Sequence, residues 1–194
     1  MIKALQLVFS SGVTWEKISL SRRGIISIFC LNWLPWMLAA TLIEAASLQH
    51  WGVPRGLSGV LEPVPLPLLK KYVGTEWAAY LILLWVGGAL VSGLGGGVHQ
   101  KFPYRLSFIL VAYSTGPLLF GRLLDAVPAI NTWVAWGIGA LLMVTCMYQG
   151  VAMVMRPEIT KGFALYLLCA TVLFVLSGLG HLLAVYVLNS GRLL

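Results

Sequence analysis

Long apolar runs alternate with short polar turns along most of this chain. A helix needs roughly 20 consecutive apolar residues to cross a bilayer, and several runs reach that length. We expect five of them to span the membrane, at about residues 25–48, 77–98, 106–124, 132–155 and 162–188. The pattern therefore predicts an all-α, polytopic membrane protein with five transmembrane helices.

The amino-acid composition points the same way. Hydrophobic residues make up 59% of the chain and charged residues only 10%, whereas a soluble domain carries about a quarter charged residues. The net charge is +7, but the basic residues are scattered among the loops and form no tract that would follow a phosphate backbone. We therefore expect membrane lipids as partners, and no nucleic acid.

The N-terminal segment, residues 1–24, has apolar positions that can share one helical face. We expect it to lie on the membrane surface as an amphipathic segment, with Trp15 as an interfacial anchor and Arg22 and Arg23 at the headgroups. A disordered tail is the alternative. A cleavable signal peptide is not expected, because the first long apolar run starts only near Ile25. At the other end, residues 189–194 form a short polar tail.

The first span contains two informative residues, Pro35 and Glu44. Pro35 removes a backbone hydrogen bond, which predicts a kink. Glu44 lies within about a turn of the end of the span, so we expect its carboxylate to reach the interface rather than to face protein. The loop that follows, residues 49–76, contains four prolines, which exclude a continuous helix. We expect this loop to cap the helices or to meet a partner.

Glycine is concentrated in the stretch 85–117, which we interpret as a helical hairpin with a basic turn and a Tyr-Ser-Thr-Gly-Pro break in its second helix. In a bilayer, small residues on one helix face let neighbouring backbones approach closely. The residues expected to mediate helix packing here and in the fifth span are Gly87, Gly88, Gly93, Gly95, Gly96, Gly97, Gly116, Pro117, Gly178 and Gly180.

The basic residues also indicate an orientation. With the N-terminus inside, eight Lys and Arg residues lie in inner segments and five in outer segments, as the positive-inside rule favours. We expect a protein of the bacterial inner membrane, with a cytoplasmic N-terminus and the C-terminus outside.

Sequence motifs for catalysis are missing. We find no Ser-His-Asp set, no HExxH, no Walker loop and no paired carboxylates. The run Gly93–Gly97 follows a membrane span and not a strand, so it does not indicate nucleotide binding. The three cysteines lie in apolar runs without metal-like spacing and are expected to act as small hydrophobic residues. We expect no enzyme, no cofactor and no metal, and note Glu44, Tyr113 and His181 as candidate functional polar groups.

The positions of the histidines argue against haem binding, and the number of spans argues against active transport. A bis-histidine haem would need two histidines at matched depth, and only His50 and His181 fall on the same side. His50 lies at a span's edge, so a hydrogen-bonded core histidine is the better interpretation of His181. An inverted repeat, typical of active transporters, does not fit five spans. A small pore or lipid-moving protein remains as the alternative function.

Several features together resemble the Yip1 domain. These are Trp15 before a hydrophobic and basic stretch, five spans, a glycine-rich second span, the run Tyr113–Pro117, Gln149-Gly150, and the turn from Arg156 to Gly162. The resemblance implies five helices with a cytosolic N-terminus and, in eukaryotic members, Rab GTPase binding in early secretory traffic. This chain lacks the long cytosolic N-terminal region of those members and resembles the compact bacterial type, so a Rab-type partner is not expected.

The predicted function follows from what the sequence contains and lacks. Small-residue helix faces and an apolar loop are abundant, whereas no catalytic set is present. We expect a non-enzymatic scaffold or accessory subunit that packs against other integral membrane subunits, for example in a respiratory or other electron-transfer complex.

Overall fold

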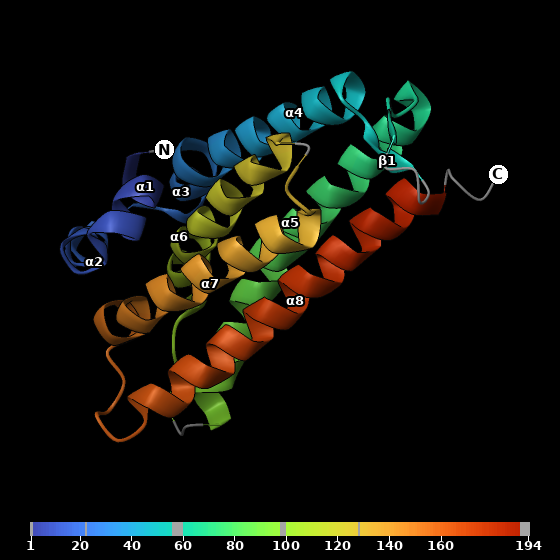
Figure 1. Cartoon of the computed structure of the whole chain (residues 1–194). Helices are drawn as coiled ribbons and strands as arrows, with labels where there is room; N and C mark the ends of the chain where they lie inside the picture. The colour runs from blue at the N-terminus through green and yellow to red at the C-terminus, as the bar shows by residue number, and fades with distance from the viewer. Residues whose placement is uncertain (1, 22, 56–59, 98–99, 128, 191–194) are drawn as a thin grey trace.

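The computed structural model describes residues 2–21, 23–55, 60–97, 100–127 and 129–190 (Figure 1). Within these residues, five helical segments are long and apolar enough to cross a membrane. Their bounds are Ile25–His50, Leu66–Gly95, Tyr104–Ala126, Thr132–Met155 and Gly162–Ser190. The predicted all-α polytopic class is therefore confirmed, with one short β-hairpin added to it.

The elements follow one another as a series of helices with irregular turns at defined points. In chain order they are α1 (Ile2–Phe9), α2 (Ser11–Leu20), α3 (Ile25–Ile28), the π-helical turn η1 (Phe29–Trp33), α4 (Leu34–His50), β1 (Val53–Arg55), β2 (Val60–Glu62), α5 (Leu66–Gly97), α6 (Tyr104–Arg122), the 3-10 turn η3 (Leu123–Ala126), α7 (Thr132–Gly150), the π-helical turn η4 (Val151–Met155) and α8 (Gly162–Ser190).

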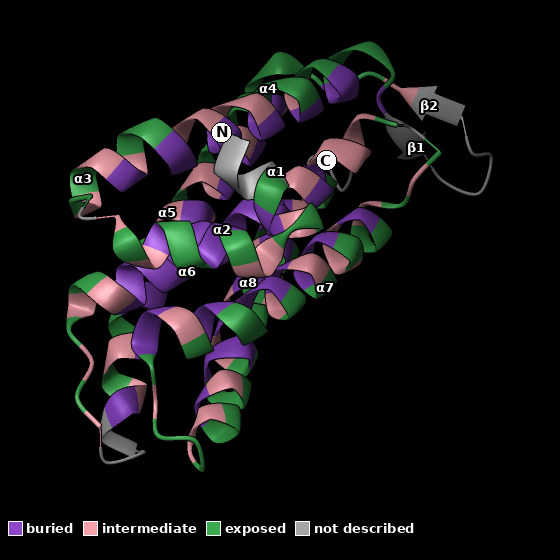
Figure 2. Cartoon of the chain, turned by 90° about the vertical axis from the view of Figure 1, so that its left-hand side faces the viewer, coloured by how far each residue is buried: buried purple, intermediate pink, exposed green. Residues whose placement is uncertain are grey.

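Helix α6 lies at the centre of the bundle. It packs against α4, α5 and α7, and the N-terminal helix α1 lies against it as well. In its membrane-spanning window 83% of the residues are buried, compared with 28% in α8. Figure 2 shows the exposed faces of the peripheral helices turned outward. The central position of α6 explains why a side chain on it can contact several other spans at once.

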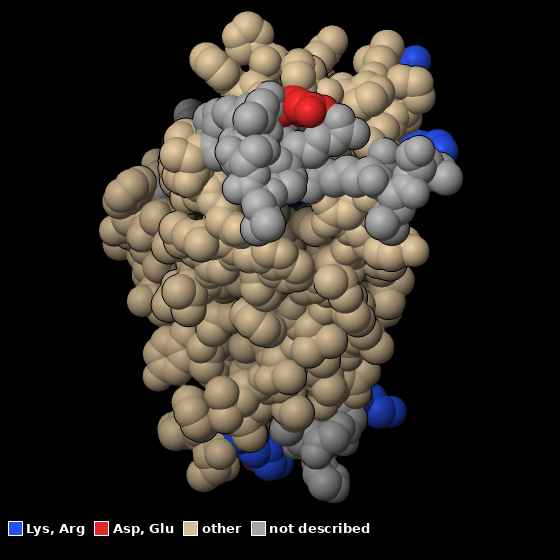
Figure 3. All heavy atoms as spheres, turned by 45° about the vertical axis from the view of Figure 1, so that its right-hand side comes forward, with Lys and Arg blue, Asp and Glu red and all other residues tan. Residues whose placement is uncertain are grey.

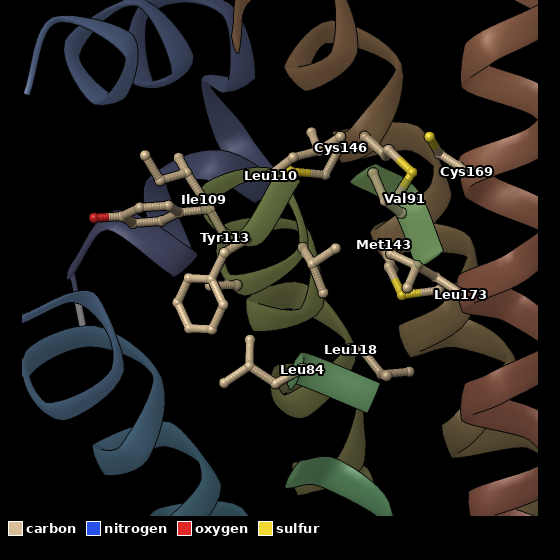
Figure 4. Packing of buried hydrophobic residues seen from close by; sticks show 14 of the residues in the cluster. Leu84, Val91, Ile109, Leu110, Tyr113, Leu118, Met143, Cys146, Cys169 and Leu173 are labelled. Carbon is tan, nitrogen blue, oxygen red and sulfur yellow. The ribbon is translucent and has the colours of Figure 1, made fainter. Parts of the chain in front are cut away.

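The core is apolar and draws on all the long helices. Figure 4 shows Leu84 of α5, Leu118 of α6, Met143 of α7 and Leu173 of α8 converging between the helices, and each of them is buried. The predicted role of the cysteines as small hydrophobic residues agrees with Cys169, which is fully buried in this cluster.

The outer surface matches a bilayer. On the face shown in Figure 3, charged side chains lie toward the two ends and an uncharged band fills the middle. Large apolar side chains of α8 are exposed, among them Leu167, Leu179, Leu183 and Tyr186. An apolar belt of this kind needs a hydrocarbon environment, since monomeric soluble proteins rarely expose such a continuous patch.

The second span begins earlier than the sequence analysis predicted. Helix α5 starts at Leu66 and not near residue 77. Pro67 is its second residue, where proline is tolerated because the first N–H groups of a helix have no internal partner. Only the first part of the expected loop 49–76 is non-helical, and there β1 pairs antiparallel with β2, with Val53 opposite Glu62.

Of the two prolines inside spans, Pro117 differs from the sequence-based expectation. Pro35 follows the π-helical turn η1 directly, which gives the predicted irregularity a defined place. Pro117, however, does not break α6, which runs without interruption to Arg122. Buried proline is tolerated there because Ser and Thr side chains and neighbouring helices compensate for missing hydrogen bonds.

Within the N-terminal segment, Trp15 is not the interfacial anchor that the sequence analysis predicted. Trp15 is fully buried, and its indole N–H donates to the Cys146 carbonyl at 2.9 Å. Gly150 makes room for it, because a Cβ at this position would lie 2.6 Å from the indole. Trp15 also meets Tyr113 edge-on, with ring centroids 6.2 Å apart. Helices α1 and α2 are therefore part of the bundle.

The glycines expected at helix contacts fall into different environments. A Cβ on Gly87 would lie 2.8 Å from Leu173, and one on Gly180 would lie 2.8 Å from Ala79, so α5 and α8 approach closely at both points. Gly93 faces open space. Among the other expected positions, Gly88 and Gly178 lie against aromatic rings, and Gly95 lies against the following turn. Gly116 and Pro117 are buried in α6. Gly96 and Gly97 are the last residues of α5.

Candidate functional site

Four charged side chains from four elements meet inside the bundle. Glu44 comes from α4, Glu76 from α5, Arg122 from α6 and Asp125 from η3. The side chain of Arg122 is 2% exposed and those of the three acids are each 4% exposed. We refer to these four residues as the Arg122 cluster.

Arg122 is the centre of this cluster. Its Nη2 lies 2.9 Å from Oε1 of Glu44 and 2.8 Å from Oε1 of Glu76. Its Nη1 lies 2.7 Å from Oδ2 of Asp125. One guanidinium thus bridges three carboxyl groups, an arrangement that its planar set of N–H donors allows and a lysine ammonium would not reproduce.

Neutral side chains add further hydrogen bonds to the cluster. The Tyr72 hydroxyl donates a short hydrogen bond to Glu44, and the Tyr80 hydroxyl donates to Glu76 Oε1 at 2.9 Å. On the other side, Arg122 Nη1 donates to Thr132 Oγ1 and to His181 Nδ1, both at 3.1 Å. Side chains from α5, α7 and α8 are therefore joined to the cluster, which contacts every spanning segment.

The charges of the cluster do not balance. One guanidinium faces three carboxyl groups, so full ionisation would leave two negative charges in a buried environment. Uncompensated buried charge is expensive, by several kcal/mol per ion. The cluster therefore either retains protons on its carboxyl groups or takes up positive charge from outside.

Glu76 and His181 lie well inside their helices, whereas Arg122 is the last residue of α6. Glu76 is ten residues after the start of α5, and His181 is nine residues before the end of α8. At 1.5 Å of rise per residue, these positions are roughly 13 to 15 Å from the helix ends. That distance is about half the thickness of the hydrocarbon core.

An open cavity connects the cluster to one end of the molecule. It has a volume of about 420 Å³, and Glu44, Tyr72 and Asp125 line it. Its other walls come from the segment between η3 and α7 and from the last turns of α8, including Asn131, Trp133, Leu188 and Asn189. We call this cavity the vestibule. Two acidic residues of the cluster, Glu44 and Asp125, thus lie in the wall of the vestibule.

A second, smaller cavity lies on the inner side of the cluster. Its volume is about 20 Å³, and Glu76, Tyr80, Arg122, Trp136 and His181 are among its lining residues. Leu83, Leu118 and Leu176 form its apolar walls. The Arg122 cluster thus separates the vestibule from a cavity that lies further into the bundle.

Two of the three candidate polar residues from the sequence meet at this site. Glu44 and His181 both contact Arg122, whereas Tyr113 lies elsewhere on α6, against Trp15. The expected position of Glu44 at the interface is wrong, because the guanidinium of Arg122 gives its carboxylate a partner inside the bundle. His50 is exposed and contacts Trp51, so it does not share the environment of His181.

The sequence analysis missed three members of the cluster. Arg122 and Asp125 were assigned to the end of the third span and to the turn after it, and Glu76 to the long loop. A helix starting at Leu66 would have placed Glu76 inside the membrane, where an acidic residue calls for a partner. Arg122 is a basic residue in an apolar run, three positions before the turn that begins at Asp125, and it would have been the natural partner for Glu76.

The donor groups of the cluster point to a charge network and not to a metal centre. Within the residues that the structure describes, no group of three or more His, Cys, Asp or Glu side chains is placed to hold a metal ion. The carboxyl groups converge on the guanidinium instead. Comparisons with protein-family models, curated proteins and solved structures gave no match, so the resemblance to the Yip1 domain stays a prediction.

Proposed function

We propose that this protein belongs to the class of small pores and transporters, and that it carries a small cation, in the simplest case a proton, by way of the Arg122 cluster. The observation behind the proposal is the excess of carboxyl groups over cations at the floor of an open vestibule. The sequence suggested a scaffold or accessory subunit and, as the alternative, a small pore or lipid-moving protein. A pore gives the buried charges a role, whereas a scaffold does not.

A purely structural role explains the cluster poorly. Burying an ion pair is often neutral or unfavourable compared with well-packed apolar side chains of the same volume. Ionisable residues within membrane spans are rare and typically mark ion or substrate pathways. The bundle already has an extensive apolar core, so it does not need charges to hold its helices together.

The contacts of Arg122 and the lining of the vestibule indicate the sign of the solute's charge. Both Nη atoms of Arg122 are occupied by carboxyl oxygens, so the guanidinium offers little to an anion. Glu44 and Asp125 line the vestibule and repel anions while attracting cations. A proton satisfies the site best, because protonating a carboxyl group lowers the negative excess without requiring additional space.

Proton flux into liposomes tests the proposal. Purified protein is reconstituted with an internal pH-sensitive dye, and a potassium diffusion potential is applied to drive proton uptake. We expect acidification faster than in empty liposomes, and a return to the empty-liposome rate in Glu44→Gln. Flux that never exceeds the empty-liposome rate, from protein shown to be folded, would contradict the proposal.

Glu158 provides a matched control for this experiment. It lies in the turn between α7 and α8, where Lys161 binds its carboxylate at 2.7 Å. Hydrogen bonding and charge attraction by Lys161 lower the pKa of this carboxyl group below its ordinary value. Because this ion pair lies outside the spans and away from the vestibule, Glu158→Gln should leave the flux unchanged.

The scaffold or accessory-subunit function expected from the sequence stays a prediction. The exposed apolar faces of α7 and α8 suit lipid and protein neighbours equally well. Gentle purification from native membranes, followed by identification of co-migrating subunits, tests this function; a solitary monomer would contradict it.

A further inference from the structure

The small cavity beside the Arg122 cluster brings together three polar atoms without protein partners. They are Oε2 of Glu76, Nε2 of His181 and Nε1 of Trp136, and none has a hydrogen-bond partner among the described residues. All three side chains line the same cavity of about 20 Å³. Leaving a buried polar atom unpaired is unfavourable, so three together in one place indicate a ligand.

The tautomer of His181 is determined by its neighbour. Nδ1 of His181 lies 3.1 Å from Nη1 of Arg122, and a guanidinium can only donate. Nδ1 must therefore accept, which places the single proton of the neutral imidazole on Nε2. The atom that faces the cavity is consequently an N–H donor.

The other two groups have defined roles as well. The indole Nε1–H of Trp136 is a donor only. Oε1 of Glu76 already accepts from Arg122 at 2.8 Å and from Tyr80 at 2.9 Å, which leaves Oε2 as a free acceptor. His181 and Trp136 are held parallel, with ring centroids 6.0 Å apart and an interplanar angle of 4°. The cavity thus presents two donors and one acceptor.

We propose that this cavity is a binding site for a single water molecule, held by Glu76, His181 and Trp136. A water molecule can accept from both N–H groups and donate to the carboxylate at the same time. Buried waters typically make about three hydrogen bonds, and one needs roughly 10 to 15 Å³ of accessible volume. Both requirements match the cavity.

Other occupants fit the site less well. A metal cation or an ammonium ion would face the positive ends of two N–H groups. An anion would face the carboxylate of Glu76. Larger neutral molecules are excluded by the volume and by the apolar walls of Leu83, Leu118 and Leu176. The site stands independently of the proposed cation flux, because water can be bound whether or not ions cross the protein.

Magnetisation transfer from water to indole N–H groups tests the site in the wild-type protein. The protein is labelled with ¹⁵N-tryptophan in lipid nanodiscs, and the Trp136 signal is assigned by its loss in Trp136→Phe. We expect a strong water cross-peak for the Trp136 indole. Trp15 and Trp33 serve as controls, since their indoles donate to Cys146 and Thr115 and should show none.

Two results would overturn the proposal. One is a Trp136 indole as isolated from water as that of Trp15. The other is a ¹⁵N-histidine spectrum in which the proton of His181 resides on Nδ1, because the cavity would then have only one donor. Both results are read in the wild-type protein, with Trp136→Phe needed only to assign one signal, and neither is affected by the outcome of the flux experiment.

Discussion

At the scale of single residues, Arg122 supplies the positive charge of the cluster. Its guanidinium contacts Glu44, Glu76 and Asp125 and is itself 2% exposed. Removing it would leave three carboxyl groups facing one another with no cation. Truncating one partner of a buried ion pair usually costs more than the pair contributes, because the other partner stays buried and unpaired.

Arg122→Leu should therefore destabilise the protein by about 3 to 5 kcal/mol, the range observed when a buried ion pair loses one partner. Arg122→Lys should recover part of the loss, since a single ammonium replaces the charge but not the bridging geometry. The measurement is the free energy of unfolding in detergent micelles.

Arg105 is the matched control for Arg122. It also belongs to α6, but its Nη2 donates to the Arg23 carbonyl at an exposed position. Arg105→Leu should change the free energy of unfolding by less than about 1 kcal/mol, as is usual for exposed polar contacts. Equal losses of unfolding free energy in Arg122→Leu and Arg105→Leu would contradict this prediction. They would show that the buried ion pairs of Arg122 contribute no more to stability than the exposed contact of Arg105.

At the scale of elements, the contact between α6 and α7 depends on glycine. A Cβ on Gly121 would collide with the backbone of Gly139, and a Cβ on Gly139 would lie 2.7 Å from the Leu118 carbonyl oxygen. Backbone atoms of a packed helix cannot move aside as the end of a flexible side chain can. This crossing brings the end of α6, and with it Arg122, up to Thr132 of α7.

Gly139→Ala should consequently lower the free energy of unfolding by about 1 to 3 kcal/mol, as expected for overpacking. Gly137 lies on the same helix with nothing within 4 Å of its would-be Cβ. Gly137→Ala should be neutral or stabilising by up to about 1 kcal/mol through helix propensity. The reverse order of these two effects in a denaturation series would contradict the packing described for α6 and α7.

The sequence predicted the spans better than the cluster within them. Hydropathy located the last three spans closely because polar turns separate them. It failed at the start of α5, where Pro65 and Pro67 were taken as evidence against a helix although they flank or occupy its first turn. The Arg122 cluster was missed for a related reason, since its members lie near span boundaries and come together only through tertiary packing.

At the scale of the whole molecule, the two ends of the bundle differ. The vestibule, the β-hairpin and the end of α8 lie together at one end, and α1 and α2 lie toward the other (Figure 1). Under the orientation predicted from the basic residues, the vestibule faces the outside. Under the proposed function, a cation would then enter the protein from outside and reach the Arg122 cluster through the vestibule.

Reporter fusions in a bacterial host test this orientation. Alkaline phosphatase is active only after export, because its disulfides form in the periplasm and not in the cytoplasm. A fusion after Leu194 should be active and a fusion within the turn 156–161 should be inactive. The opposite pair of activities would place the vestibule on the cytoplasmic side.

The docking of Trp15 has a consequence for the order of assembly during synthesis. Trp15 is bound by the Cys146 carbonyl and packed on Gly150, which are made more than a hundred residues later. Helices α1 and α2 therefore leave the ribosome first but reach their final contacts only after the fourth span has entered the membrane. Until then their apolar faces need a temporary neighbour, and the bilayer surface is the nearest one. Helices α1 and α2 thus reach their native contacts late, although they are made before all five spans.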